Sequence, residues 1–303
     1  MTKREDVYKR ITDKIVEQLE AGVRPWHKPW DSSHAIGRIQ RPLRHTGDPY
    51  SGINTIMLWL EAEMQGFPYA TWMTLRQANE LGGRVIKGSK STPVVFARRI
   101  EKAEENDAGD EVDASYLCYK EYRVFNIDQC EGLPCHYYDP MNTPVDPIDR
   151  DVRAKAFFDH LGADIRTGGN RAYYSISTDH VQMPHLQTFE DTVAYESTLG
   201  HECVHWTRHK SRLDRSFGRK RWGDEGYAAE ELVAEMGAAF LCADLNLTPS
   251  VREDHVAYID NWIQVLKRDK RAIFTAASHA ERAVRFMHDL QPKADDEDLK
   301  EAA

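Results

Sequence analysis

The chain has 303 residues, of which 41% are hydrophobic, 10% aromatic and 29% charged. This composition excludes collagenous, low-complexity and largely disordered proteins and predicts a globular chain, and the length predicts two domains. No apolar run approaches the length of a membrane helix, and no apolar stretch follows the charged first residues, so we expect neither a membrane span nor a signal peptide. Five scattered cysteines fit a reducing compartment better than a disulfide framework, and we expect a cytoplasmic protein.

Charge is distributed unevenly along the chain. Residues 1–100 contain 16 Lys and Arg against 10 Asp and Glu, whereas residues 101–303 contain 24 against 39. A basic part on a chain of net charge −9 indicates a polyanionic partner for that part alone. The alternative is an ordinary surface with an accidental excess of cations.

The first half of the chain mixes helical and extended patterns. Apolar periodicity predicts helices over residues 6–21, 53–65 and 74–81. Residues 92–100 and 116–127 are rich in β-branched and aromatic residues, which predicts two paired strands. Residues 101–115 between them are strongly acidic and predict a solvated, mobile loop.

A proline-rich segment at residues 136–150 predicts a linker to the second half. Beyond it the patterns predict strands over residues 163–166 and 172–177, and helices over residues 151–161, 192–209, 227–245, 252–268 and 272–290. The predicted fold class is α+β. A small α+β domain occupies residues 1–135, a mainly helical domain occupies residues 151–290, and an acidic tail follows at residues 291–303.

One motif carries explicit chemistry. Residues 201–205 read His-Glu-Cys-Val-His, an HExxH sequence inside the predicted helix 192–209. Histidines four residues apart lie on one face of a helix, so the imidazoles of His201 and His205 can reach one metal ion. Glu202 can then take a proton from a water that the ion acidifies and pass it to a leaving amine. The motif indicates a metallopeptidase site, and a helix with two structural histidines is the alternative.

Carboxylates that could supply a third ligand lie on the predicted helix 227–245. At about 100° per residue, Glu231 and Glu235 share one margin of its apolar face, whereas Glu230 points away on the other margin. Carboxylates beside an apolar stripe need a positive partner, which a metal ion would provide. Glutamate zincins, which this pattern resembles, often use the first acid of such a pair. Glu231 is therefore the favoured ligand and Glu235 the carboxylate that orients a ligand histidine, with the reverse assignment open.

This ligand set suits Zn²⁺, although imidazole and carboxylate also accept Mn²⁺, Co²⁺ or Ni²⁺. In a peptidase, residues 172–177 are the candidate edge strand for pairing with an extended substrate. Tyr174 or Tyr227 is the candidate hydrogen-bond donor to a tetrahedral oxyanion.

Aromatic and basic residues are interleaved in the first third of the chain. Aromatic rings that stack on bases, beside cations that contact phosphates, are typical of single-strand binding. The alternative is that the tryptophans belong to a core. The candidate DNA-binding residues are Trp26, Trp30, Arg38, Arg41, Arg44, Arg84, Lys87 and Lys90.

Several motifs together resemble the ArdC-type antirestriction proteins. In the first half they are Pro25-Trp26, Pro29-Trp30, Tyr50-Ser51-Gly52-Ile53-Asn54, Trp72-Met73-Thr74, Leu81-Gly82-Gly83 and Tyr122-Arg123-Val124-Phe125-Asn126. In the second half they are Arg171-Ala172-Tyr173-Tyr174, His201-Glu202-Cys203-Val204-His205-Trp206-Thr207, Arg212-Leu213 and Glu230-Glu231-Leu232-Val233-Ala234-Glu235. The resemblance covers nearly the whole chain apart from the acidic loop and the tail.

The resemblance implies single-stranded DNA binding by the first domain, a zincin-like metallopeptidase fold in the second, and protection of incoming plasmid DNA from host restriction during conjugation. A host restriction-related protein is then the expected substrate or target. Two alternatives stay open: a non-catalytic protein that coats single-stranded DNA and has a structural metal site, and a DNA-dependent metalloprotease that acts on DNA-bound proteins.

Overall fold

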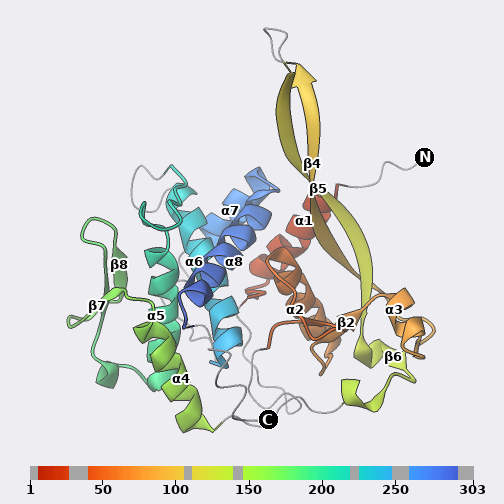
Figure 1. Ribbon diagram of the computed structural model, residues 1–303, viewed down its shortest axis with the longest axis horizontal. Coiled ribbons are helices and arrows are strands. Elements are labelled where there is room, and N and C mark those ends of the chain that lie inside the picture. Colours follow the sequence, from red (N-terminus) through yellow and green to blue (C-terminus); the bar gives the residue numbers. More distant parts are fainter. Residues whose placement is uncertain are drawn as a thin grey trace. The chain divides into compact units, whose positions relative to one another are not determined.

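The computed structural model describes residues 6–26, 40–105, 111–138, 146–218, 225–247 and 259–292. The chain divides into two compact units (Figure 1). Unit 1 comprises Met1–Arg41 with Met141–Ala303, and unit 2 comprises Pro42–Pro140. Both units contain helices and strands, which confirms the predicted mixed class with two domains. Among the described residues, no helix is both long and apolar enough to cross a membrane.

Unit 2 is built on a four-stranded sheet with the strand order β1-β2-β5-β4. Its strands are β1 (Leu43–Arg44), β2 (Thr71–Met73), β4 (Thr92–Glu105) and β5 (Glu111–Asn126). Helix α2 (Ile53–Gln65) packs on this sheet through a core of Tyr50, Leu58, Trp72, Val94 and Val124. The short strands β3 (Arg84–Val85) and β6 (Cys130–Glu131) pair beside α3 (Leu75–Glu80), and single turns of 3-10 helix cover Ile127–Gln129 and Cys135–Tyr137.

Local signals explain the helix ends of unit 2. α2 ends at Gly66, whose φ of 70° lies in the left-handed region that glycine tolerates. α3 begins with a capping box, in which the side chains of Thr74 and Gln77 satisfy each other's backbone N–H groups. The helices predicted over residues 53–65 and 74–81 are therefore confirmed.

The predicted acidic loop is largely wrong. β4 and β5 form one long antiparallel ribbon whose register runs from Thr92 opposite Val124 to Glu105 opposite Glu111, so residues 101–105 and 111–115 are strand (Figure 1). The rest of the predicted loop lies outside the described residues. Acidic composition reports how well side chains are solvated, but it does not prevent backbone amides from pairing across a hairpin.

Unit 1 is mainly helical. Its helices are α1 (Val7–Glu20), α4 (Pro147–Asp159), α5 (Thr192–Trp206), α6 (Glu225–Leu245), α7 (Ile259–Arg268) and α8 (Ala272–Asp289). A three-stranded sheet of β7 (Asp164–Thr167), β9 (His180–Met183) and β8 (Tyr173–Ser175), in that order, lies beside α5, and Leu186–Thr188 forms a 3-10 turn. α6 contacts α5, α7 and α8, and it is buried almost all the way round.

Helix α1 is part of unit 1, which differs from the predicted domain over residues 1–135. Its buried face includes Ile11, Ile15 and Leu19, and the helix packs against α7. The Thr12 hydroxyl donates to the carbonyl oxygen of Lys270 at 2.7 Å, and the rings of Tyr8 and Phe274 lie 4.7 Å apart. Amphipathic periodicity predicts that a helix buries one face, but it does not say against which partner.

The predicted linker over residues 136–150 also overlaps a helix. α4 starts at Pro147 with Asp146 as its N-cap, earlier than the predicted residue 151. Proline is well tolerated in the first turn of a helix, because the N–H that it lacks has no intrahelical partner there. Proline at this position therefore marks the start of a helix and not a linker.

Candidate metal centre

Two helices that lie in close contact carry the candidate site. α5 contains the HExxH residues, and its N-cap Asp191 accepts a hydrogen bond from the N–H of Ala194 at 2.7 Å. Opposite it, Gly237 of α6 leaves no room for a side chain, because a Cβ there would lie 2.8 Å from Cγ2 of the buried Val204. The missing side chain lets the two backbones approach closely enough for acids on α6 to reach histidines on α5.

We expect Gly237→Ala to push the two helices apart. Overpacking of this kind costs about 1–3 kcal/mol, and it should lower metal affinity because the ligands come from both helices. The matched control is Gly200→Ala on α5, where a Cβ would meet Leu241 at 3.4 Å, an ordinary contact. Thermal unfolding and metal titration of both variants test this. Equal behaviour of the two variants would contradict it, and the double variant Gly237→Ala with Val204→Ala should recover part of the loss.

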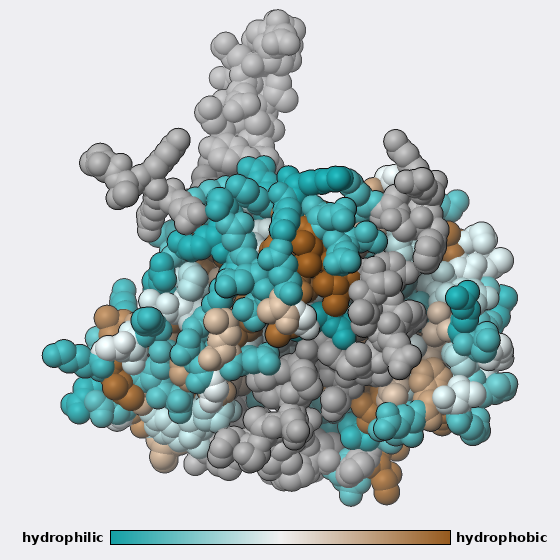
Figure 2. Space-filling model, turned by 180° about the vertical axis from the view of Figure 1, so that it is seen from behind, coloured by the Kyte–Doolittle hydropathy of each residue, from teal (hydrophilic) through white to brown (hydrophobic). Residues whose placement is uncertain are grey.

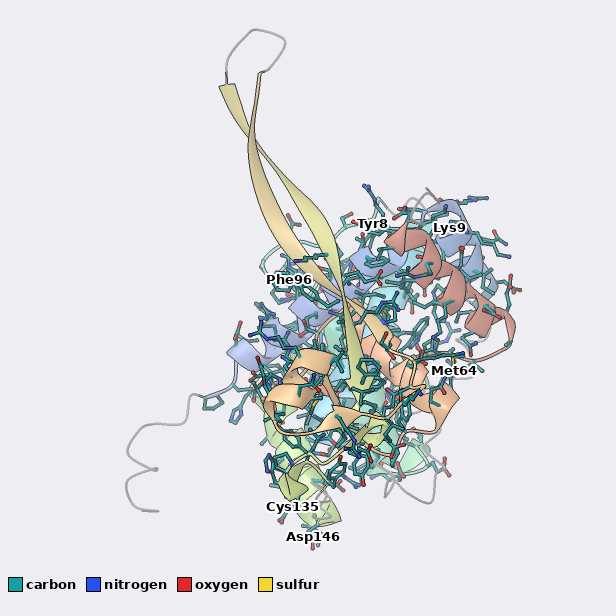
Figure 3. The ribbon with its side chains drawn as sticks, turned by 90° about the vertical axis from the view of Figure 1, so that its right-hand side faces the viewer. Tyr8, Lys9, Met64, Phe96, Cys135 and Asp146 are labelled. Atoms are coloured by element: carbon teal, nitrogen blue, oxygen red, sulfur yellow. The ribbon has the colours of Figure 1, made fainter. Side chains whose placement is uncertain are left out.

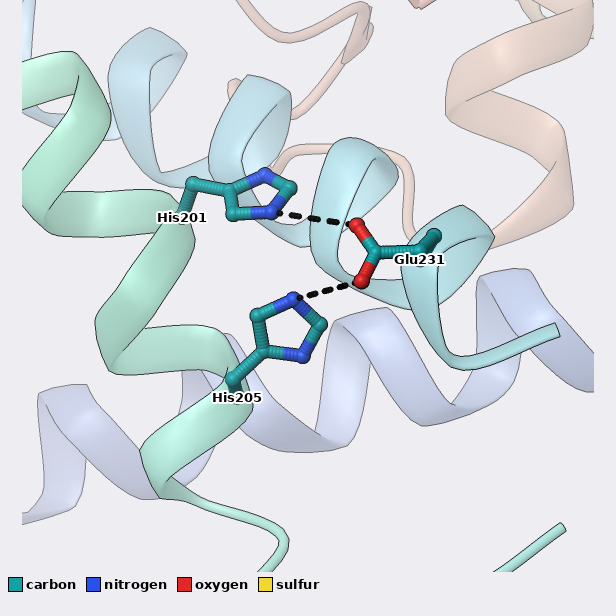
Figure 4. Close-up of side chains that lie close together, drawn as sticks. All are labelled: His201, His205 and Glu231. Atoms are coloured by element: carbon teal, nitrogen blue, oxygen red, sulfur yellow. Dashed lines mark ion pairs between the residues drawn. The ribbon is translucent and has the colours of Figure 1, made fainter. Parts of the chain in front are cut away.

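His201, His205 and Glu231 form a compact buried cluster (Figure 4). Nε2 of His201 lies 3.6 Å from Oε2 of Glu231, and Nε2 of His205 lies 3.5 Å from Oε1. In tetrahedral coordination with metal–ligand distances of about 2.0–2.1 Å, neighbouring ligand atoms are about 3.3 Å apart. The two separations are close to this value, and the ligand atoms of all three side chains lie within 4.8 Å of one another, so the cluster could hold one divalent ion.

The other ring nitrogens face separate carboxylates. Nδ1 of His201 lies 3.9 Å from Oε1 of Glu235, and Nδ1 of His205 lies 3.1 Å from Oε1 of Glu230. A carboxylate at Nδ1 fixes the ring so that Nε2 presents its lone pair to a metal. Glu231 therefore faces Nε2 of both rings as the candidate ligand, and Glu235 lies beside Nδ1 of His201 as the candidate for orienting that ring.

The prediction that Glu230 points away from the site is wrong. Glu230 is only 2% exposed, and it receives two hydrogen bonds from the buried Arg215, at 2.9 and 2.8 Å, in addition to its contact with His205. A helical wheel assumes one apolar stripe with a solvated back, whereas α6 is enclosed on most sides. A buried carboxylate on the far margin therefore still faces protein.

The acids of the site stay ionised. Burial by itself would raise the pKa of Glu230 and Glu231, but Arg215 and His205 hold the pKa of Glu230 at about 2, and His205 and His201 hold that of Glu231 well below its usual range. Burial would likewise lower the pKa of His205, yet Glu231 and Glu230 raise it to about 10. In the metal-free chain a proton on His205 therefore balances part of the negative charge.

We expect metal binding near pH 7 to release about one proton, because Nε2 of His205 must lose its proton to act as a ligand. Titration calorimetry in two buffers of different ionisation enthalpy measures this number. Release of no proton would mean that His205 is already neutral.

The same raised pKa implies that His205 stabilises the metal-free fold fully below its unfolded pKa of about 6.5. This contribution is lost as the pH rises toward 10.

The structure places the remaining predicted catalytic groups as follows. Glu202 follows His201 on α5 and is 3% exposed. Tyr227 lies one turn before Glu231 on α6. Tyr174 on β8 donates its hydroxyl to Asp179 at 2.8 Å and accepts a hydrogen bond from Arg212 at 3.3 Å, so its proton is already engaged. Burial and the neighbouring Asp179 also raise the pKa of Tyr174 above its usual value.

Comparison with known proteins places the chain in a family. Residues 152–279 match the family model of a zincin-like metallopeptidase, and residues 5–125 match that of the N-terminal domain of anti-restriction factor ArdC. The metal-free crystal structure of the antirestriction protein ArdC from plasmid R388 is 44% identical, with a TM-score of 0.78, over 94% of this chain and 97% of that chain. This chain belongs to the ArdC antirestriction family.

Further relatives include a metal-bound structure and proteins of similar or much greater length. The Mn(II)-bound structure of R388 ArdC is 42% identical with a TM-score of 0.77, over 94% of this chain and 98% of that chain. The protein y4eC of Sinorhizobium fredii (strain NBRC 101917 / NGR234) is 40% identical over 98% of this chain and 96% of its own length. A DNA primase TraC of Escherichia coli is 34% identical over 94% of this chain, but this region is only 27% of TraC.

In this ArdC-family chain, two of the predicted DNA-binding residues are buried. Trp26 is 1% exposed and donates from Nε1 to Oε2 of Glu235 at 3.3 Å. Arg41 is 6% exposed and forms ion pairs with Asp244 at 2.7 Å and Glu281 at 2.8 Å. Neither side chain is available to a base or a phosphate, so these two predictions are wrong. Position in a loop suggested exposure, but both residues are held by unit 1.

The other candidates divide into two groups. Lys87 and Lys90 are exposed, Arg44 is exposed with its guanidinium over the ring of Tyr50, and Arg84 is exposed but paired with Glu131 at 2.6 Å. Trp30 and Arg38 lie outside the described residues.

Trp26 instead contacts Glu235, which faces His201 of the candidate metal cluster. We expect Trp26→Phe, which keeps the aromatic ring and removes the N–H donor, to weaken metal binding by about 10-fold. It should leave DNA affinity unchanged. Trp262→Phe is the control for the loss of an indole donor, since the Trp262 ring packs edge-to-face against Trp26 at 5.8 Å but its Nε1 donates to the carbonyl oxygen of Ala228. If Trp26→Phe loses DNA affinity and keeps its metal affinity, the sequence-based prediction that Trp26 binds DNA would be restored.

Proposed function

We propose that this protein protects incoming plasmid DNA from host restriction during conjugation by binding the entering single strand. Membership of the ArdC antirestriction family is the observation that carries this proposal. Two relatives named DNA primase TraC share the region, which also favours a role on nucleic acid. The exposed cations of unit 2, Arg44, Lys87 and Lys90, are the candidate phosphate contacts that remain.

We further propose that unit 1 is a metallopeptidase acting on a host restriction-related protein. The support is the zincin-like family match together with the buried cluster of two histidines and one glutamate. Imidazole and carboxylate suit Zn²⁺, and they equally suit Mn²⁺, the ion bound in one R388 ArdC structure. When bound, such an ion would act as a Lewis acid and lower the pKa of a water molecule.

The residues of the chain would divide the remaining work. His201, His205 and Glu231 hold the ion, Glu235 and Glu230 fix the two imidazoles, and Glu202 holds the proton in transit from the attacking water to the leaving amine. Tyr174 and Tyr227 stay the two candidate oxyanion donors, and Tyr174 would have to release its hydrogen bond to Asp179 in order to act.

The strand β8 is suited to substrate binding. Among the described residues it pairs with β9 alone and lies at an edge of the three-stranded sheet, next to α5. A free strand edge can hold an extended peptide through main-chain hydrogen bonds. The Asp179–Arg212 ion pair connects the β8–β9 turn to the segment after α5 and so keeps this edge beside the HExxH helix.

The test is transfer of an unmodified plasmid by conjugation into a restricting host, with the wild-type protein or Glu202→Gln. Peptidase action predicts that Glu202→Gln loses protection while keeping its metal and its DNA affinity, because the amide cannot accept the proton. Full protection by this variant would mean that the metal has only a structural role. It would support the alternative of a non-catalytic protein that coats single-stranded DNA. Cleavage of DNA-bound proteins in general, only when single strands are present, would support the second alternative.

A further inference from the structure

Two large aromatic side chains are exposed on the ribbon of β4 and β5 in unit 2. Phe96 on β4 is 58% exposed and Tyr122 on β5 is 42% exposed. Figure 3 labels Phe96 on the ribbon. The coloured part of the surface in Figure 2 is mostly hydrophilic, with several separate apolar groups. Single exposed apolar side chains are common on protein surfaces, so these two rings are informative only if they stand together.

The strand register puts these rings on one face of the ribbon. Phe96 lies opposite Lys120, and Val94 lies opposite Tyr122, so Phe96 and Tyr122 are diagonal neighbours. Nζ of Lys120 lies 5.1 Å from the centre of the Tyr122 ring. Two aromatic rings and one ammonium group therefore stand together, and we call them the Phe96–Tyr122 platform.

The platform continues a face that is buried farther down the ribbon. Val94 and Val124, on the same face, are 6% and 2% exposed and pack against Leu58 and Trp72. Next to this core on the same face, the side chains of Phe96, Lys120 and Tyr122 are exposed. Apolar rings left in water at the end of a core are unfavourable for folding, so their presence favours a binding role.

The adjacent strand edge argues against a peptide as the ligand. The side chain of Asn54 donates to the carbonyl oxygen of Val95 at 2.7 Å and accepts from its N–H at 2.8 Å. These are the outward-facing backbone groups that an added strand would need at this position. A peptide could pair here only after displacing Asn54.

Charge favours a polyanion instead. The segment from Arg84 to Arg99, which leads into the platform, has five basic residues and no acidic residue. Residues 101–113, farther along the ribbon, have seven acidic residues and one lysine. Phosphates are therefore attracted near Phe96 and repelled farther out, which confines a bound strand to the inner part of the ribbon.

We propose that Phe96 and Tyr122 stack on bases of single-stranded DNA and that Lys120 contacts a phosphate between them. Stacking on aromatic rings tolerates any base sequence, as binding to an entering strand requires. This inference rests on the proposed function and assigns to it a surface that the sequence alone does not reveal.

The experiment measures binding of a fluorescent oligothymidylate to the full chain by anisotropy. Phe96→Ala and Tyr122→Ala should each weaken binding roughly 5- to 100-fold. Phe96→Tyr and Tyr122→Phe, which keep the rings, should bind nearly as the wild type. Leu75→Ala and Met64→Ala are matched controls, because these side chains of unit 2 are 52% and 51% exposed outside the platform and should not matter. All of these side chains are exposed, so their truncation should leave folding intact.

An abasic strand of the same length separates stacking from phosphate contact. The alanine variants and the wild type should bind it equally weakly, since it offers no ring to stack. If the wild type binds the oligothymidylate and both alanine variants bind it equally tightly, the proposed role of the platform is wrong and the proposed function still stands. Absence of wild-type binding to any single strand would overturn both.

Discussion

Glu231→Gln should reduce metal affinity by more than about 100-fold, because it removes a charged ligand from a three-residue site, and even loss of an outer hydrogen-bond partner costs about 10–100-fold. Glutamine keeps the size of the side chain, so the metal-free fold should persist. Calorimetric titration with Mn²⁺ and with Zn²⁺ measures the change. Glu196→Gln is the matched control, since Glu196 is also a buried glutamate and lies on the HExxH helix outside the cluster.

Glu235→Gln distinguishes the two assignments that the sequence left open. Glu235 faces Nδ1 of His201 and not the shared centre of the cluster, so its loss should weaken binding by only about 10–100-fold. Weaker binding by Glu235→Gln than by Glu231→Gln would exchange the roles of the two acids.

Arg215→Ala should be the most destabilising single change near the site. Arg215 is 4% exposed and donates to both oxygens of Glu230, to the hydroxyl of Thr207 at 3.1 Å and to the carbonyl oxygen of Val204 at 2.9 Å. Removing one partner of a buried ion pair costs about 3–5 kcal/mol, because the other charge stays buried. Chemical denaturation measures the loss. Arg166→Ala, which removes an exposed pair with Asp164, should change stability little.

A double variant separates stability from metal binding in this network. Arg215→Met with Glu230→Leu removes the buried pair completely, which should restore much of the stability. Metal affinity should stay low, because Nδ1 of His205 still lacks its carboxylate. Recovery of both properties would mean that Glu230 does not position His205.

The three residues of the candidate metal cluster were predictable because their signals are local. Four-residue spacing sets the two histidines on one face of α5, and the same periodicity sets Glu231 beside Glu235 on α6. The roles of Glu230 and Trp26 were not predictable. The contacts of Glu230 exist because other helices enclose α6. The Trp26–Glu235 hydrogen bond joins residues that are 209 positions apart. No spacing rule reports such contacts.

The limits of the fold prediction have the same cause. The helix over residues 6–21 was evident, but not its packing on α7, which depends on the whole of unit 1. β9 (His180–Met183) was missed because a four-residue strand with one histidine and one glutamine gives little pattern, although it is the centre of its sheet. The Phe96–Tyr122 platform needed the strand register, which composition does not supply.

Binding of single- and double-stranded oligonucleotides by the full chain, measured across a salt series, tests the central claim most directly. We predict tighter binding of the single strand and an affinity that falls steeply with salt, because each phosphate contact releases a counterion. Absence of binding at low salt, or a preference for the duplex, would contradict the proposed role on an entering strand.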